Sequence, residues 1–201
     1  MNIARPVNDA LRRVPPWAIY IVAPVPAIWY FWLGLTGGLG AEPIKALEHA
    51  LGLFALKLLV AVLAITPLRR FAGINLVRFR RAVGVVAFFY VALHLSAWLF
   101  LDIRDPARIW ADILKRPYIT VGMAGFVLLL PLALTSNDWS VRRMGPGWRR
   151  LHRLTYPAVL LGGVHYLMLV KGWQMAPLVY LAAILALLGL RWRWRRRRAM
   201  A

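Results

Sequence analysis

The sequence contains no cysteine and few charged residues, and each shortage excludes a class of protein. Without cysteine, the chain forms no disulfides and offers no thiolate to an iron–sulfur cluster, a thiolate-bound haem or a thioether-attached haem. Any iron cofactor must therefore depend on histidine or methionine. Only 16% of the 201 residues are charged and 61% are hydrophobic, which is too apolar for a soluble globular domain. We therefore expect an integral membrane protein.

Acidic residues are especially scarce. The chain has 26 Lys and Arg against 7 Asp and Glu, which gives a formal net charge of +19. Nucleic-acid-binding proteins also carry such an excess, but here the basic residues cluster between apolar runs. That distribution is typical of the cytoplasmic loops of membrane proteins. We expect contacts with membrane lipids and no nucleic-acid binding.

Apolar runs of about 20 residues, the length that a helix needs to cross a bilayer, recur along the chain. The first run contains Pro24 and Pro26, which are expected to bend it. It lacks a small-residue cleavage site and is expected to be kept, not removed as a signal peptide. No internal repeat or second domain is visible. The predicted fold is an all-α, six-transmembrane-helix bundle that forms a single domain over residues 1–201, with spans at about 17–35, 48–66, 82–101, 118–135, 151–170 and 175–190.

The positions of the basic residues predict the orientation of this bundle. Most Lys and Arg residues fall in the N-terminal arm, in the second and fourth connections and in the C-terminal tail. Since cytoplasmic loops carry the positive excess, both termini are expected in the cytoplasm. In a bacterium, this places the protein in the inner membrane with its other face toward the periplasm.

Two of the four histidines, His94 and His165, are expected to lie at one depth. Counted from the cytoplasmic ends of their spans, both lie about 18 to 21 Å into an apolar core of about 30 Å. Ionisable side chains at such a depth are costly and are usually functional. Imidazoles on facing helices are common axial ligands of an iron porphyrin in a helix bundle. The pattern favours a b-type haem between His94 and His165.

Other interpretations of these histidines stay open. An intramembrane histidine is often held by a hydrogen bond to a carbonyl or hydroxyl group of another helix, and Ser96 and Thr155 are available partners. A zinc site is less favoured, because zinc usually takes a third ligand and no acidic residue lies at this level. His49 is expected near the periplasmic edge.

His152 and Lys57 are further candidates for the cofactor site. His152 lies about 220° away from His165 around an ideal helix, unless Pro157 changes the register, so its role as a possible iron ligand is left open. Lys57 lies in the middle of a span, where a cation is costly. It is expected either to neutralise a haem propionate, a quinone carbonyl or a flavin phosphate, or to snorkel or bond a helix carbonyl.

Several short motifs carry a resemblance to a known family. In their order and spacing, they resemble the MsrQ (YedZ) family of haem-binding membrane subunits, part of the wider ferric-reductase-like transmembrane group. That group holds two haems between paired histidines on two helices, and this sequence departs from it by lacking the inner histidine of the third span. The motifs are Glu42-Pro43-Ile44-Lys45, His49, Ala55-Leu56-Lys57, Ala64-Ile65-Thr66-Pro67, Arg80-Arg81, Leu93-His94-Leu95, Arg116-Pro117-Tyr118, Trp148-Arg149-Arg150-Leu151-His152 and His165-Tyr166-Leu167.

The resemblance implies an electron-transfer subunit with no substrate chemistry of its own. Members of the family take electrons from the quinone pool or a cytoplasmic flavin reductase and pass them through haem b. The electrons reach MsrP, a periplasmic molybdopterin enzyme that reduces methionine sulfoxide in oxidised proteins. FMN is also associated with the family, and we assign no residues to it. The alternatives are a ferric reductase or superoxide-forming membrane cytochrome of the same fold, and a non-redox helical scaffold or transporter subunit.

Overall fold

The computed structural model describes residues 4–170 and 172–199, and its regular secondary structure within these ranges is helical. Among the described residues, four helical segments are long and apolar enough to cross a membrane, namely Ala18–Leu35, Pro43–Ala72, Val77–Ile103 and Pro117–Leu134. A shorter apolar helix covers Met175–Arg191. The chain is therefore a multi-pass membrane protein, as its composition predicted.

Proline divides the first membrane segment. After the amphipathic helix α1 (Ala4–Arg13), the segment consists of α2 (Ala18–Val22) and α3 (Pro24–Leu35). Prolines lack a backbone N–H and interrupt the hydrogen-bond ladder where the bend was expected. The buried hydroxyl group of Tyr90 bridges the interruption, because it accepts from the Ala27 N–H at 3.1 Å and donates to the Ala23 carbonyl at 2.6 Å.

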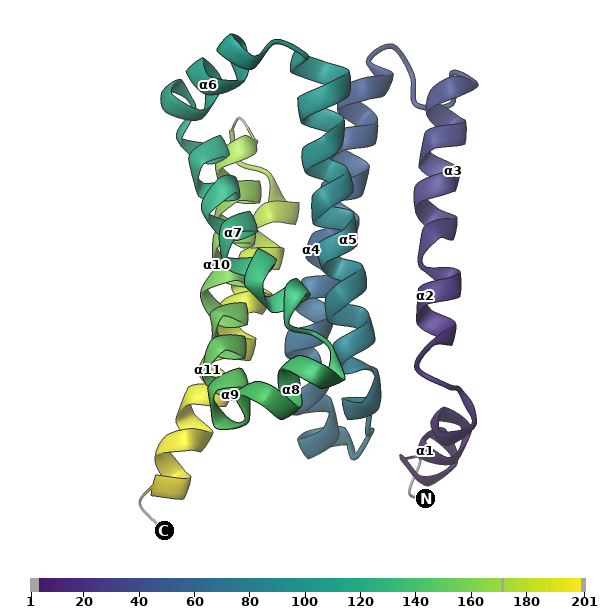
Figure 1. Cartoon of the computed structure of the whole chain (residues 1–201), viewed down its shortest axis with the longest axis vertical. Coiled ribbons are helices and arrows are strands. Elements are labelled where there is room, and N and C mark those ends of the chain that lie inside the picture. The colour runs from purple at the N-terminus through teal and green to yellow at the C-terminus, as the bar shows by residue number, and fades with distance from the viewer. Residues whose placement is uncertain (1–3, 171, 200–201) are drawn as a thin grey trace.

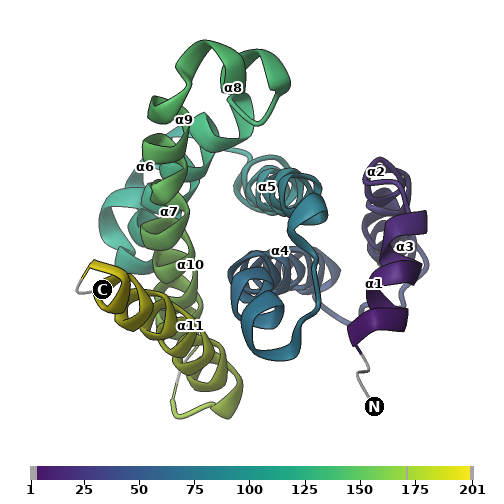
Figure 2. The same cartoon turned by 90° about the horizontal axis from the view of Figure 1, so that it is seen from below.

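Two antiparallel helix pairs form the body of the molecule (Figures 1 and 2). The first pair consists of α4 (Pro43–Pro67), which is extended by the π-helix η1 (Leu68–Ala72), and α5 (Arg80–Ala97). The second consists of α7 (Pro117–Leu134) and α10 (Thr155–Leu169). Helix α11 (Met175–Ala199) packs against both α10 and α4, and α3 packs against the outside of α4.

Short helices form most of the connections. The 3-10 turn η2 (Val77–Phe79) precedes α5 and the π-helix η3 (Trp98–Ile103) follows it. Residues 106–115, expected as part of a loop, form α6 (Pro106–Lys115), because Asp105 caps its first turn by accepting from the Ala107 N–H at 3.0 Å. Helices α8 (Asp138–Met144) and α9 (Pro146–Leu151) lie between α7 and α10.

The fifth predicted span is shorter than expected. Its first residues form the end of α9 and the 3-10 turn η4 (His152–Leu154), and the α-helix begins at Thr155. Pro157 therefore lies in the first turn of α10, where proline is tolerated. Helix α10 has 15 residues, or about 22 Å at 1.5 Å per residue. Lys171, in the predicted turn between the last two spans, lies outside the described residues.

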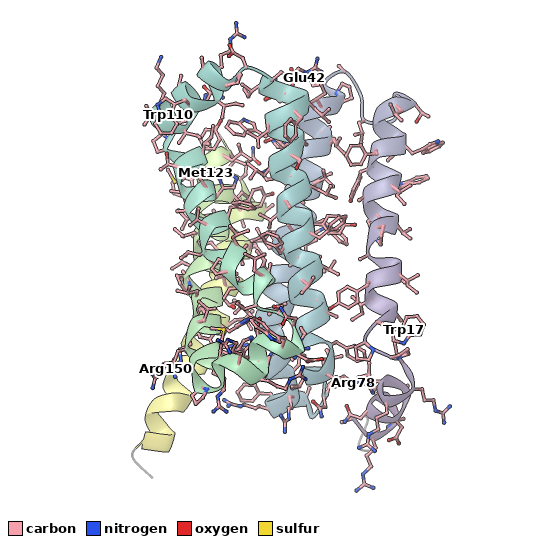
Figure 3. The ribbon with its side chains drawn as sticks, viewed as in Figure 1. Trp17, Glu42, Arg78, Trp110, Met123 and Arg150 are labelled. Carbon is pink, nitrogen blue, oxygen red and sulfur yellow. The ribbon has the colours of Figure 1, made fainter. Side chains whose placement is uncertain are left out.

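The two ends of the bundle differ in charge. Side-chain nitrogen atoms gather at the end that carries Arg78 and Arg150, whereas Glu42 and Trp110 lie at the other end (Figure 3). Both ends of the chain lie toward the basic end (Figure 1). The orientation predicted from the sequence requires such a difference in charge between the two ends.

An apolar core fills the space between the helix pairs toward the basic end. Its buried members come from α4, α5, α7, α10 and α11 and are Leu56, Leu59, Leu63, Ala87, Leu129, Leu132, Ala158, Val159 and Ile184. Toward the opposite end, a cavity lies between the two helix pairs.

Candidate functional site

The cavity has a volume of about 620 Å³ and lies between the two helix pairs. This volume is within the range of about 300 to 1,000 Å³ that is typical of ligand pockets. Its walls are mainly apolar, and polar side chains stand toward the end that carries α6, among them Lys45, Glu48, His49, Asp102 and Arg116. The cavity therefore suits a largely apolar molecule with a polar edge.

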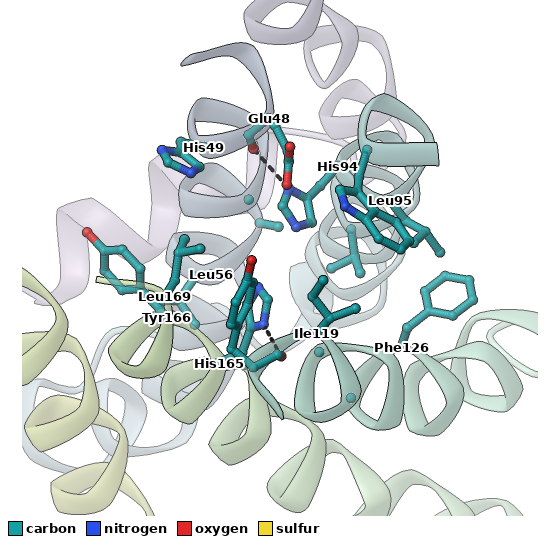
Figure 4. Close-up of a pocket in the computed structure, with 18 of the residues that line it drawn as sticks. Glu48, His49, Leu56, His94, Leu95, Ile119, Phe126, His165, Tyr166 and Leu169 are labelled. Atoms are coloured by element: carbon teal, nitrogen blue, oxygen red, sulfur yellow. Dashed lines mark hydrogen bonds between the residues drawn. The ribbon is translucent and has the colours of Figure 1, made fainter. Parts of the chain in front are cut away.

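His94 from α5 and His165 from α10 face each other across this cavity (Figure 4). Their ring centres are 6.1 Å apart and their ring planes are inclined at 73°. The structure thus brings together the two histidines that helix depth placed at one level. The two imidazoles come from different helix pairs, so a group held between them would link the two halves of the molecule.

Backbone carbonyl groups fix the orientation of both rings. Nδ1 of His94 lies 2.9 Å from the Glu48 carbonyl oxygen, and Nδ1 of His165 lies 2.7 Å from the Tyr118 carbonyl oxygen. Because a carbonyl only accepts, each Nδ1 is the donor, and in a neutral imidazole Nε2 then has a free lone pair. Metal-binding histidines are typically oriented in this way. Ser96 and Thr155, the partners that the alternative interpretation offered, do not make these bonds.

Two glycines allow the rings to lie against the neighbouring helices. A Cβ atom added at Gly52 of α4 would lie 3.0 Å from Nδ1 of His94, and one added at Gly122 of α7 would lie 2.8 Å from Nδ1 of His165. Each glycine follows its acceptor carbonyl, at Glu48 or Tyr118, by one helical turn. Sequence reasoning missed both glycines. The signal that could have identified them is the presence of a glycine inside an apolar helix.

The spacing of the two rings fits a metal bound between them. Two metal–nitrogen bonds of about 2 Å, with about 1.2 Å from each nitrogen to its ring centre, give a separation of about 6.4 Å, close to the observed 6.1 Å. Among the described residues, no three His, Cys, Asp or Glu side chains are grouped to hold a metal ion. The donor set therefore fits an iron porphyrin, which supplies its own equatorial ligands, better than it fits zinc.

The walls of the cavity also suit a flat molecule. Small residues from three helices line it and leave room for a broad planar face, while larger apolar side chains such as Leu95 and Phe126 border it. At its polar edge, Lys45 and Arg116 are bound to Glu42 and Asp112 and remain partly exposed. The small wall residues are Gly52, Ala55, Gly122, Gly125, Ala158 and Gly162.

The other predicted site residues lie elsewhere. His152 does not line the cavity; its ring stacks on Trp148 with centres 3.8 Å apart, and its Nε2 lies 3.1 Å from the Thr135 hydroxyl group. Lys57, predicted as a candidate for the cofactor site, is exposed on the surface of α4 and does not line the cavity either. His49 lies at the polar edge. The structure thus separates His152 and Lys57 from the His94–His165 pair.

At the inner position of α5, where the resemblance predicts a histidine in related proteins, the chain has basic residues. Arg80 donates to the Thr66 hydroxyl group at 2.5 Å, and Arg81 forms an ion pair with Asp138. The hydrogen bond from Arg81 holds the pKa of the Asp138 carboxyl group below its usual range. Within the described residues, no second pair of histidines faces across the bundle at this level.

Comparison with known proteins identifies relatives. Residues 19–163 match the family model described as ferric reductase like transmembrane component. The chain is 48% identical over 173 residues to a Brucella ovis protein named protein-methionine-sulfoxide reductase heme-binding subunit MsrQ, and the match covers 86% of this chain and 79% of that protein. Proteins of the same name from Brucella suis and Brucella melitensis show the same identity and coverage. No solved structure matches the chain.

Proposed function

The chain belongs to the MsrQ family of the ferric-reductase-like transmembrane proteins, and on this premise we propose that it binds haem b and transfers electrons to a protein-methionine-sulfoxide reductase. The electrons come from the quinone pool or a cytoplasmic flavin reductase. They leave toward a periplasmic molybdopterin subunit, MsrP, which repairs oxidised periplasmic proteins. The proposal includes six spans in a bacterial inner membrane, with both termini in the cytoplasm.

The observation that carries the proposal is the geometry of His94 and His165. Two imidazoles from separate helices face each other at a centre distance of 6.1 Å, and each has its Nδ1 bonded to a carbonyl group. Both Nε2 atoms are therefore available to one metal ion. If the two histidines served only in helix packing, their free Nε2 lone pairs would have no need of a shared cavity of about 620 Å³.

The protein groups have distinct parts in this function. A bound haem supplies an iron centre that takes up and releases one electron. His94 and His165 would hold the iron, while the Glu48 and Tyr118 carbonyl groups fix the rings and would increase their basicity toward it. The apolar core excludes water on the cytoplasmic side of the site. The position of the cavity toward the α6 end favours electron delivery to a periplasmic acceptor.

The cations at the polar edge have a separate role in this function. Lys45 and Arg116 are positioned at the end of the cavity nearest to water. Porphyrin propionates are anions, and they are stabilised where cations and water are both available. The names of the relatives mention haem and not FMN, so we leave FMN out of the proposal.

Visible absorption spectroscopy of the purified full chain tests the proposal. The protein from haem-sufficient cells is expected to show a Soret band and a sharp α-band on reduction. His94→Ala and His165→Ala should each lose most of both bands, while the control His49→Ala, which changes a histidine at the polar edge, should retain them. A colourless wild-type protein would support the non-redox scaffold and contradict the proposal.

Electron delivery is tested by mixing the reduced chain with MsrP and methionine sulfoxide under anaerobic conditions. Reoxidation of the haem that requires both the partner and its substrate is expected. Reoxidation by ferric chelates or by dioxygen, with no response to MsrP, would instead indicate a ferric reductase or a superoxide-forming cytochrome.

A further inference from the structure

Two arginines converge at the basic end of the bundle. Arg80, at the start of α5, donates from Nη2 to the Thr66 hydroxyl group at 2.5 Å, and Arg191 of α11 donates from Nη2 to the Leu63 carbonyl oxygen at 2.7 Å. Leu63 and Thr66 lie one turn apart on α4. Guanidinium groups from two helices thus meet the same short stretch of a third helix.

Further contacts hold the two arginines close to each other. Arg191 also donates from Nη1 to the Tyr156 hydroxyl group at 3.1 Å, and its guanidinium group lies 5.4 Å from the centre of that ring. Arg80 is near enough to Arg191 and to Arg69 to be repelled by both. Three positive charges therefore lie together where the membrane-spanning helices end.

No carboxylate group compensates these charges within the described part of the chain. Asp138 is the acidic residue that follows α7, and it pairs with Arg81 instead. Among the residues that the structure describes, Nε of Arg80 and Nε of Arg191 are buried and have no hydrogen-bond partner. Buried donors are almost always satisfied in proteins, and unpaired buried charges are costly.

We propose that Arg80 and Arg191, with Arg69 beside them, form a binding site for a phosphate-bearing anion. The planar guanidinium group presents donors in a fork that matches the oxygen atoms of phosphate. The three arginines lie at the basic ends of α4, α5 and α11, at the level where a cytoplasmic leaflet presents its phosphate groups. The anion is either the headgroup of an acidic phospholipid or a soluble phosphate compound.

This site is separate from the histidine cavity. Leu56 and Leu59 of α4 line the inner part of the cavity, whereas Leu63, whose carbonyl group accepts from Arg191, does not line it. From Gly52 beside His94 to Leu63 the helix rises about 16 Å. The proposal therefore does not depend on haem binding, and its test uses measurements that do not involve haem.

Lipid retention by the purified full chain in detergent is the first test. The chain is equilibrated with dioleoylphosphatidylglycerol or dioleoylphosphatidylcholine and analysed by native mass spectrometry. The wild type should retain one phosphatidylglycerol with at least about tenfold preference over phosphatidylcholine. Arg80→Gln and Arg191→Gln should each reduce this preference about tenfold or more, because each removes charge-assisted hydrogen bonds. Arg143→Gln, a matched loss of charge near Trp139 at the same end, should leave it unchanged.

Thermal stability in lipid-free detergent distinguishes the two sources of phosphate. If the ligand is a soluble compound, inorganic phosphate should raise the melting temperature of the wild type and not that of Arg80→Gln, and phosphatidylglycerol should show no preference. Circular dichroism checks that each variant keeps its helix content. Arg80→Lys, which keeps the charge and loses the fork, should bind less tightly than the wild type. The proposal is overturned if the wild type and the Arg80→Gln and Arg191→Gln variants behave alike in both tests.

Discussion

Gly52 and Gly122 hold equivalent positions on the two sides of the cavity. Each lies one turn beyond a carbonyl group that accepts a hydrogen bond from a histidine of the neighbouring helix, and each leaves the space in which that histidine ring lies. The α4–α5 and α7–α10 pairs therefore present their histidines by the same local arrangement. Backbone atoms, rather than polar side chains, orient both rings.

This arrangement predicts the effect of enlarging the glycines. A methyl group at Gly122 would stand 2.8 Å from Nδ1 of His165, so Gly122→Ala must displace the ring and should lower haem occupancy severalfold. Gly52→Ala, at 3.0 Å from His94, should have a smaller effect, and leucine at either position should abolish binding. The Soret absorbance per protein measures the occupancy. Gly84→Ala is the control, because a Cβ atom there meets no neighbour and should stabilise α5 by about 1 kcal/mol.

His152 is expected to stabilise the fold without binding haem. Its ring stacks on Trp148 and bonds the Thr135 hydroxyl group outside the cavity. His152→Ala should therefore lower the free energy of unfolding by about 1 to 2 kcal/mol and leave the haem spectrum unchanged. Unfolding followed by far-ultraviolet circular dichroism gives the first quantity. A loss of haem in a well-folded His152→Ala protein would show that this histidine does reach the cofactor.

Replacement of Lys57 should leave the cofactor site intact. The residue is exposed on α4 and lies outside the cavity, and a cation in the middle of a span typically costs about 2.5 to 3.5 kcal/mol. Lys57→Leu should therefore bind haem as the wild type does and insert into membranes at least as efficiently. Haem content and the yield of membrane-inserted protein are the measurements. A reduced haem content would show that Lys57 contributes to the cofactor site.

The absence of cysteine makes the topology directly testable. Ala107→Cys in α6 and Met144→Cys in α8 each introduce a single thiol at an exposed position near opposite ends of the bundle. A membrane-impermeant maleimide added to intact spheroplasts should label Ala107→Cys and should label Met144→Cys only after lysis. The reverse pattern would place the basic end in the periplasm.

The depth of the histidines was predictable from the sequence, and the rotation of the helices was not. Depth follows from counting residues at a fixed helical rise from charged ends, and it placed His94 and His165 together. Rotation depends on which face of a helix packs, and a helix that is apolar on all sides gives no periodic signal. The sequence therefore did not show that Lys57 faces outward from α4. The acceptors at Glu48 and Tyr118 are backbone carbonyl groups. Because every residue has such a group, no sequence pattern identifies them.

The local structure was likewise predictable from the sequence only in part. The prolines predicted where the first segment is interrupted, but the contact with Tyr90 that bridges the interruption requires the packing of α5. The helix α6 was missed because its acids and bases resemble a loop, although Asp105 and Pro106 form a recognisable helix start. The arginine site depends on residues from distant parts of the chain, so sequence spacing did not reveal it.

Electron paramagnetic resonance of the oxidised protein tests the central claim most directly, because it reports the two axial ligands of a ferric haem and the angle between their planes. The rings of His94 and His165 are inclined at 73°. The account predicts a low-spin signal with the strong anisotropy of nearly perpendicular imidazoles, which is lost in His94→Ala and in His165→Ala. A high-spin signal in the wild type, or a low-spin signal that survives both substitutions, would contradict it.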